Sequence, residues 1–173
     1  MKRRELILYA TPTGELANTC ARYFEAAASL GPTAAQGYPP HCTLTGFFHR
    51  AGERGEEVAD EVADLLHATG QPPAGAVTVR GPRRHDHWLG LELESDWLAR
   101  VVAEFVDHHR LDPGDDRLRP KERLHLSLAY DVLDLDPYVE LADGFDFGAG
   151  ADGPWQVALW ERGPNNGWHR FDS

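Results

Sequence analysis

The sequence predicts a mixed α+β fold with two pseudo-symmetric lobes, whose mainly antiparallel sheets flank a central cleft. Short runs with strand-like alternation are interspersed with longer stretches that carry apolar residues at helical spacing. The order helix, loop, histidine-bearing strand occurs once in each half of the chain. No Gly/Ser-rich linker or low-complexity tract separates the halves. We therefore expect one bilobal domain over residues 1–173, with lobes at roughly 1–80 and 81–173 and with room for the end strands to exchange between them.

In the first half, apolar alternation predicts short strands and a spacing of three and four residues predicts helices. Gly31-Pro32 is expected to end the first helix, and Thr13 is its candidate N-cap. The second helix carries an apolar stripe and ends before Gln71-Pro72-Pro73. The expected elements are a strand over 6–10, a helix over 13–30, a strand over 41–48, a helix over 55–68 and a strand over 77–80.

The second half repeats these patterns and adds a hairpin. The stretch Pro164-Asn165-Asn166-Gly167 contains Asn-Gly, which favours a tight turn between two antiparallel strands. The expected elements are a strand over 88–93, a helix over 97–109, a strand over 124–130, a short helical turn over 137–141, a strand over 155–162 and an edge strand within 165–171.

Two of these strands each combine a histidine with a hydroxyl residue. The strand period of two places His41 and Thr43 on one face of the first, and His125 and Ser127 on one face of the second, with apolar residues opposite. A neutral imidazole can accept a proton and a protonated one can donate to a leaving oxygen. A neighbouring hydroxyl can hold a phosphate oxygen. The two motifs therefore predict acid–base chemistry at one phosphate, and the alternative is that both histidines are structural residues at sheet edges.

The segments Pro40-His41-Cys42-Thr43-Leu44 and His125-Leu126-Ser127-Leu128 resemble the motifs of the two-histidine (2H) phosphoesterase superfamily, whose members carry one His-x-Thr/Ser-x motif in each of two lobes. The second segment is most similar to the cyclic-phosphodiesterase branch, in which a tyrosine at the place of Tyr130 lines the site. Strict alternation would put Tyr130 on the core face, so it reaches the cleft only if the strand bends or ends there.

This resemblance implies hydrolysis or transfer at a cyclic phosphate, such as a nucleoside 2′,3′-cyclic phosphate, or at a small phosphodiester. It implies neither metal nor cofactor. His41 and His125 would be the acid–base pair, and Thr43 and Ser127 would bind the phosphate. Two rival functions stay open: a phosphate-ester or nucleotide-binding module without turnover, and an RNA-end-processing or ligase-like enzyme of the same fold.

The segment Arg83–Trp88 is the most basic stretch of the chain. It could form a substrate loop in which arginines bind phosphate and Trp88 stacks on a base. The alternative is a solvated loop before a strand, with Trp88 in the core. His85 and His87 lack a third ligand at a matching spacing, so no metal site is expected.

The overall charge of the chain indicates which kinds of ligand it can bind. The chain has 17 Lys and Arg against 28 Asp and Glu, a net charge of −11, which argues against a duplex DNA partner and favours a small anionic substrate, with RNA ends as a further candidate. The loop Asp112–Lys121 mixes both signs, as solvated loops do, although its place before His125 could bring Arg117, Arg119 or Lys121 to the cleft rim.

Targeting features are absent from the sequence. No window approaches the ~18 apolar residues of a membrane span, and the N-terminal apolar run is too short for a signal peptide. The two cysteines, Cys20 and Cys42, match no metal or redox spacing. We therefore expect a cytoplasmic protein with reduced thiols and without a membrane partner.

Overall fold

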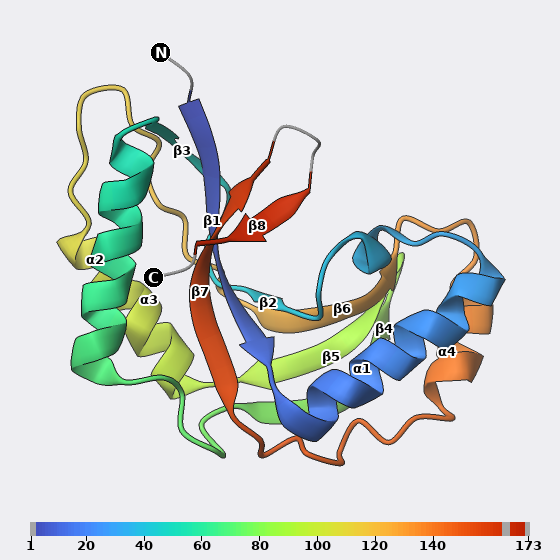
Figure 1. Ribbon diagram of the computed structural model, residues 1–173. Helices are drawn as coiled ribbons and strands as arrows, with labels where there is room; N and C mark the ends of the chain where they lie inside the picture. The colour runs from blue at the N-terminus through green and yellow to red at the C-terminus, as the bar shows by residue number, and fades with distance from the viewer. Residues whose placement is uncertain (1–2, 164–166, 172–173) are drawn as a thin grey trace.

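The mixed α+β fold is confirmed by a computed structural model, which describes residues 3–163 and 167–171 (Figure 1). Within these residues eight strands form a single sheet, accompanied by four α-helices and two short 3₁₀ helices. The strands are β1 (Arg3–Pro12), β2 (Cys42–Thr43), β3 (Phe48–Ala51), β4 (Thr78–His85), β5 (Trp88–Glu94), β6 (Leu124–Tyr130), β7 (Trp155–Arg162) and β8 (Trp168–Arg170). The helices are α1 (Gly14–Ala27), η1 (Ala28–Leu30), η2 (Ala34–Gly37), α2 (Arg54–Thr69), α3 (Asp96–His108) and α4 (Asp136–Ala142).

The strand order is β4-β5-β6-β2-β1-β7-β8, and β3 pairs with β1 beyond the end of β2. The pairings between these strands are antiparallel, as predicted. The late strand β7 pairs with β1 on one edge and with β8 on the other, whereas β6 pairs with β5 and β2. The strands expected for two lobes are thus joined in one sheet through the β2–β6 pair. Pseudo-symmetry of two lobes and their division near residue 80 stay predictions.

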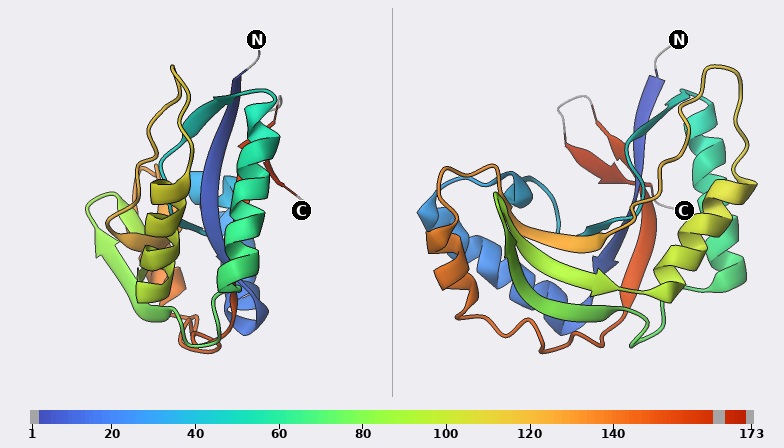
Figure 2. Two further views of the ribbon diagram at one scale, coloured as in Figure 1. Left: turned by 90° about the vertical axis from the view of Figure 1, so that its left-hand side faces the viewer. Right: turned by 180° about the vertical axis from the view of Figure 1, so that it is seen from behind.

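The four α-helices pack on one face of the sheet, and Figures 1 and 2 show that the sheet curves strongly. Alternation in β1 sends Leu6, Leu8 and Ala10 into the same buried core as residues from all four helices. Full burial of one leucine side chain stabilises a fold by about 1.5–3 kcal/mol, so this shared apolar face fixes which side of each strand points inward. The other side chains of β2, β5 and β6 are left to face a cleft.

Helix ends follow the sequence signals in part. The Ser95 hydroxyl caps α3 by accepting from the Leu98 backbone N–H at 3.1 Å. The expected N-cap bond from Thr13 is wrong, because the Thr13 hydroxyl donates instead to the Pro154 carbonyl at 2.8 Å. The first helix runs on through η1 and stops at Gly31, whose φ of 122° suits glycine.

The strand expected over 41–48 is interrupted. Leu44 N–H donates to the Leu8 carbonyl at 2.9 Å, and the Thr45 hydroxyl accepts from Leu8 N–H at 3.1 Å. At Leu8, a side-chain oxygen thus replaces the backbone acceptor that a continuous strand would supply. The segment after Thr43 pairs with β1 again only at β3.

The C-terminal hairpin is confirmed by the antiparallel pairing of β7 with β8. The turn predicted at Pro164-Asn165-Asn166 lies outside the described residues. In the part of the chain that the structure describes, no helix is both long enough and apolar enough to cross a bilayer.

Candidate functional site

The pairing of β2 with β6 places the two histidine motifs side by side. Cys42 is the partner of Leu126 in this antiparallel pair. Continuing the register sets His41 opposite Ser127 and Thr43 opposite His125. Opposite side chains in such a pair have Cβ atoms about 4.5–5.5 Å apart and diagonal ones about 7–8 Å. The imidazoles therefore occupy opposite corners of a small square, and the hydroxyls occupy the other two.

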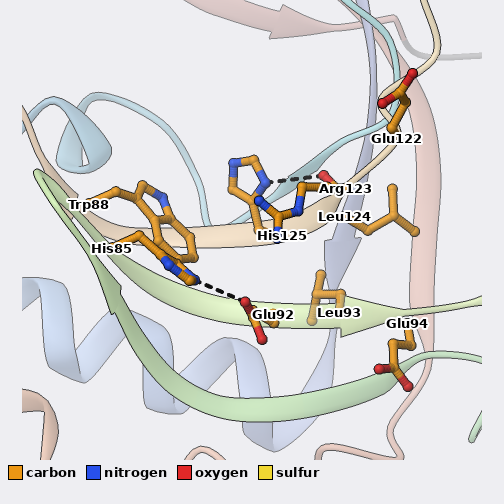
Figure 3. Close-up of a pocket in the computed structure, with 9 residues that line it drawn as sticks. All are labelled: His85, Trp88, Glu92, Leu93, Glu94, Glu122, Arg123, Leu124 and His125. Atoms are coloured by element: carbon orange, nitrogen blue, oxygen red, sulfur yellow. Dashed lines mark hydrogen bonds and ion pairs between the residues drawn. The ribbon is translucent and has the colours of Figure 1, made fainter.

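This square opens into a cavity of about 500 Å³. Six of the residues singled out from the sequence line it: His41, Thr43, Trp88, His125, Ser127 and Tyr130. Ala35 and Pro39 and the β4–β5 turn at 85–87 complete the wall. A neighbouring cavity of about 510 Å³ shares His85, Trp88 and His125, and Figure 3 shows these three side chains rising from the sheet.

Both imidazoles are oriented by a hydrogen bond to the backbone carbonyl two residues earlier in the chain. His41 Nδ1 lies 2.8 Å from the Pro39 carbonyl oxygen, and His125 Nδ1 lies 3.2 Å from the Arg123 carbonyl oxygen. A carbonyl can only accept, so each Nδ1 carries the hydrogen. In the neutral ring Nε2 is then an unprotonated acceptor, as a general base requires.

The environment favours neutral imidazoles. Burial lowers the pKa of His41, the Pro39 carbonyl partly opposes this, and the nearby His125 lowers it further. Burial also lowers the pKa of His125, with a smaller lowering from Lys121 and Arg123. A bound phosphate would act in the opposite direction, because an anion stabilises an adjacent imidazolium. The site is therefore suited to hold one extra proton when a phosphate is present.

Trp88 orients the hydroxyl of Ser127. The indole Nε1–H donates to Ser127 Oγ at 2.9 Å, which leaves the hydroxyl hydrogen available to a ligand. The indole reaches Ser127 by lying over Gly90, where a Cβ would be 2.3 Å from Trp88 Cζ2. Trp88 thus lies in the cavity wall and not in the core, and its use as a stacking surface for a base stays a prediction. The His85 ring already stacks on it with centroids 5.7 Å apart.

A β-bulge brings Tyr130 to the cavity. Gly90 pairs with Ser127 and Leu89 pairs with Ala129, so Leu128 is an extra residue in β6. Leu128 and Ala129 are both buried, and Tyr130 returns to the cavity face opposite Trp88. The sequence predicts that Tyr130 reaches the cleft only if the strand bends, and this bulge is the bend. The two consecutive apolar residues Leu128 and Ala129, which break the strand alternation, are the sequence feature that indicates it.

Sequence reasoning missed Tyr9. Its buried ring lies 4.0 Å from the His41 ring between centroids, and Tyr38 approaches His41 at 5.6 Å. Burial raises the pKa of Tyr9, and the neighbouring Tyr38 and Tyr130 raise it further. Tyr9 therefore stays protonated and packs against His41 as a neutral ring. Because side chains alternate along a strand, the core-facing Leu8 places the neighbouring Tyr9 on the opposite, cavity face, and this pattern could have identified it from the sequence.

The basic stretch before Trp88 divides between two roles. Arg83 and Arg84 lie on β4 and not in a loop, and they form ion pairs with Glu92 and Asp136 instead of lining the cavity. His85 and His87 do line it. Among the described residues, no three His, Cys, Asp or Glu side chains are grouped closely enough to hold a metal ion.

Three known proteins show similarity to this chain. An ecdysteroid-phosphate phosphatase of Bombyx mori is 25% identical over 170 residues, which cover 93% of this chain and 25% of that protein. The 5′-3′ exoribonucleases Rnm of Salmonella typhimurium and Escherichia coli are 29% and 28% identical over 116 and 119 residues, covering 60% and 61% of this chain and 36% of each enzyme. The chain thus spans a quarter to about a third of these relatives. No known protein-family profile matches it.

Proposed function

We propose that this chain is a phosphodiesterase that opens a cyclic phosphate, such as a nucleoside 2′,3′-cyclic phosphate, or cleaves a small phosphodiester. Catalysis would be acid–base catalysis by His41 and His125 without a metal, as in the 2H phosphoesterases. The observation that carries the proposal is the square of two imidazoles and two hydroxyls around one cavity. We also propose that residues 1–173 act as one bilobal catalytic unit.

In the proposed reaction, Thr43 and Ser127 donate hydrogen bonds to non-bridging phosphate oxygens. The neutral imidazole takes a proton from water as its oxygen bonds to phosphorus, and the protonated imidazole gives its proton to the departing oxygen as that P–O bond breaks. The attacking and departing oxygens stand on opposite sides of phosphorus. Diagonal placement of the two rings suits this requirement. The two histidines exchange protonation states in each turnover and are reset by solvent.

The similar proteins support a phosphate ester as the substrate class, since two are named as exoribonucleases and one as a phosphatase. They do not point to a single substrate. The matched segments are a minor part of each relative, and the named activity could reside in another part. We therefore base the choice of a phosphodiester on the paired histidines.

The test is incubation of chelator-treated protein with nucleoside 2′,3′-cyclic phosphates, ADP-ribose cyclic phosphate and small diesters, with products read by mass spectrometry. We expect addition of one water to at least one substrate. His41→Ala and His125→Ala should each lower kcat at least about 100-fold, the usual scale for a positioned acid or base. His108→Ala, at the exposed end of α3, is the matched control. A His41→Ala variant with full activity would refute the assignment, and a ligand-induced rise in Tm without product would support the binding module instead.

A further inference from the structure

We propose a second phosphate-binding subsite on Arg119 and Lys121, beside Thr43. The substrate would then carry a further phosphate on the Thr43 side of the phosphate that reacts. This inference rests on the proposed function and narrows its substrate class. For a nucleoside 2′,3′-cyclic phosphate, the further phosphate would be at the 5′ position, either as a free 5′-phosphate or as the preceding linkage of an RNA end.

The subsite is a hollow that continues from the candidate site. A cavity of about 300 Å³ has Thr43 in its wall, and Thr43 also lines the cavity that contains both histidines. The two cavities therefore meet at the hydroxyl expected to bind the reacting phosphate. The remaining lining residues of the smaller cavity are Ile7, Thr45, Gly46, Phe47, Arg119, Pro120 and Lys121.

The charges at this hollow are not neutralised by neighbours. The chain has a net charge of −11, and many of its arginines are ion-paired. Neither Arg119 nor Lys121 forms an ion pair with another described residue, and both are exposed. Lys121 is also close enough to His125 to lower its pKa. Two uncompensated cations in an acidic protein, next to a proposed phosphate site, favour an anionic ligand.

The backbone holds this pair in place. Gly46 N–H donates to the Arg119 carbonyl at 2.8 Å, and Lys121 N–H donates to the Leu44 carbonyl at 2.9 Å. The Arg119 guanidinium lies over Gly46, where a Cβ would be 3.3 Å from its Nε, and it makes one long bond of 3.5 Å to the Phe47 carbonyl. Most of its donors therefore remain available for a phosphate.

An aromatic surface adjoins the cations. Phe47 is 43% exposed and stacks on Trp168, with ring centroids 5.3 Å apart and an interplanar angle of 13°. Cations that track phosphates beside rings that accept a base are the recurring elements of single-strand binding. This combination favours a nucleotide phosphate over a simple inorganic anion.

A second cavity next to His125 has the reverse polarity. This cavity of about 510 Å³ is lined by Glu92, Glu94 and Glu122, with Arg123 and His85 as its cationic groups. Figure 3 shows Glu92 and Glu94 on one side of His125 and Glu122 on the other. Carboxylates repel additional phosphates, so a substrate with several phosphates would extend toward Arg119 and Lys121.

The experiment compares kcat/KM for a nucleoside 2′,3′-cyclic phosphate with and without a 5′-phosphate, at one pH and ionic strength. We expect the 5′-phosphate to raise kcat/KM about tenfold or more, as charge-assisted hydrogen bonds do. In the double variant Arg119→Gln/Lys121→Gln this ratio should fall to near one. The control Arg100→Gln removes an exposed charge on α3 and should keep the wild-type ratio.

A third substrate, a dinucleotide that ends in a cyclic phosphate, separates the two sources of the phosphate. A higher kcat/KM than for the 5′-phosphorylated mononucleotide identifies an RNA end, and an equal value identifies a small nucleotide. A wild-type ratio near one, or a ratio that survives in the double variant, overturns the subsite while turnover itself sustains the proposed function. Absence of turnover with all three substrates would overturn the subsite as proposed, and the proposed function would be contradicted only if the other substrates of the panel also gave no product.

Discussion

The hydrogen bond from Trp88 to Ser127 offers a test of how the hydroxyl is positioned. Trp88→Phe removes the 2.9 Å Nε1–H···Oγ contact but keeps an aromatic ring between His85 and His125. A neutral hydrogen bond contributes about 0.5–1.5 kcal/mol net. If all of it is used to orient Ser127 in the transition state, kcat/KM should fall about 2- to 13-fold.

A double-mutant cycle assigns this loss to Ser127. We expect Ser127→Ala to lower kcat/KM, and Trp88→Phe to add almost nothing in the Ser127→Ala background, which gives a coupling energy of about 0.5–1.5 kcal/mol. The matched control is Trp97→Phe, the same change on α3, where the side chain packs against the core from outside the cavity. Losses that multiply in the double variant would refute the reasoning, because Trp88 would then act without Ser127.

Three further predictions concern the pH dependence, metals and packing. Burial lowers the pKa of both His41 and His125 in the free protein below the ordinary histidine value of about 6.5, so the singly protonated pair should be populated only at pH values below it. We expect kcat/KM to rise and then fall with pH, with the fall already under way above about pH 6.5. A profile that still rises above pH 7 would contradict this. Turnover should persist in excess EDTA, measured on the best substrate of the panel, and loss restored by a divalent ion would remove the metal-free mechanism. Gly90→Ala should cost about 1–3 kcal/mol of unfolding free energy in denaturant melts, because its Cβ would overlap Trp88 and a backbone carbonyl, whereas Gly81→Ala has open space and should be nearly neutral.

The sequence was most informative where the apolar period alone decides the structure. The strand Leu124–Tyr130 and the strand Trp155–Arg162 were predicted with the bounds that the structure has, and α2 and α3 were placed to within one residue. Each of these segments buries one regular face, and burial of that face fixes the element. The cavity-facing positions of both motifs follow from the same alternation.

Features that depend on pairing between distant strands were harder to predict. The break after Thr43 requires the Thr45 hydroxyl to meet Leu8, and no local pattern encodes that contact. The sequence left open whether the charged loop around Arg119 is merely solvated or reaches the cleft rim, because its place beside the candidate site follows from backbone bonds to residues 44 and 46. The bulge at Leu128 had a local signal, but its size and effect on Tyr130 depend on the β5–β6 register.

The β2–β6 register itself explains why two such short motifs could make one site. A slip by one residue would turn the His41 motif toward the core, because neighbouring side chains point to opposite faces. A slip by two residues could set His41 directly opposite His125, with Cβ atoms about 5 Å apart, which leaves no room for a phosphate between the rings. The observed pairing of Cys42 with Leu126, both fully buried, avoids both outcomes. Each imidazole then faces the hydroxyl of the other motif, and a phosphate held by the two hydroxyls would have one ring on either side, as attack and departure on opposite sides of phosphorus require.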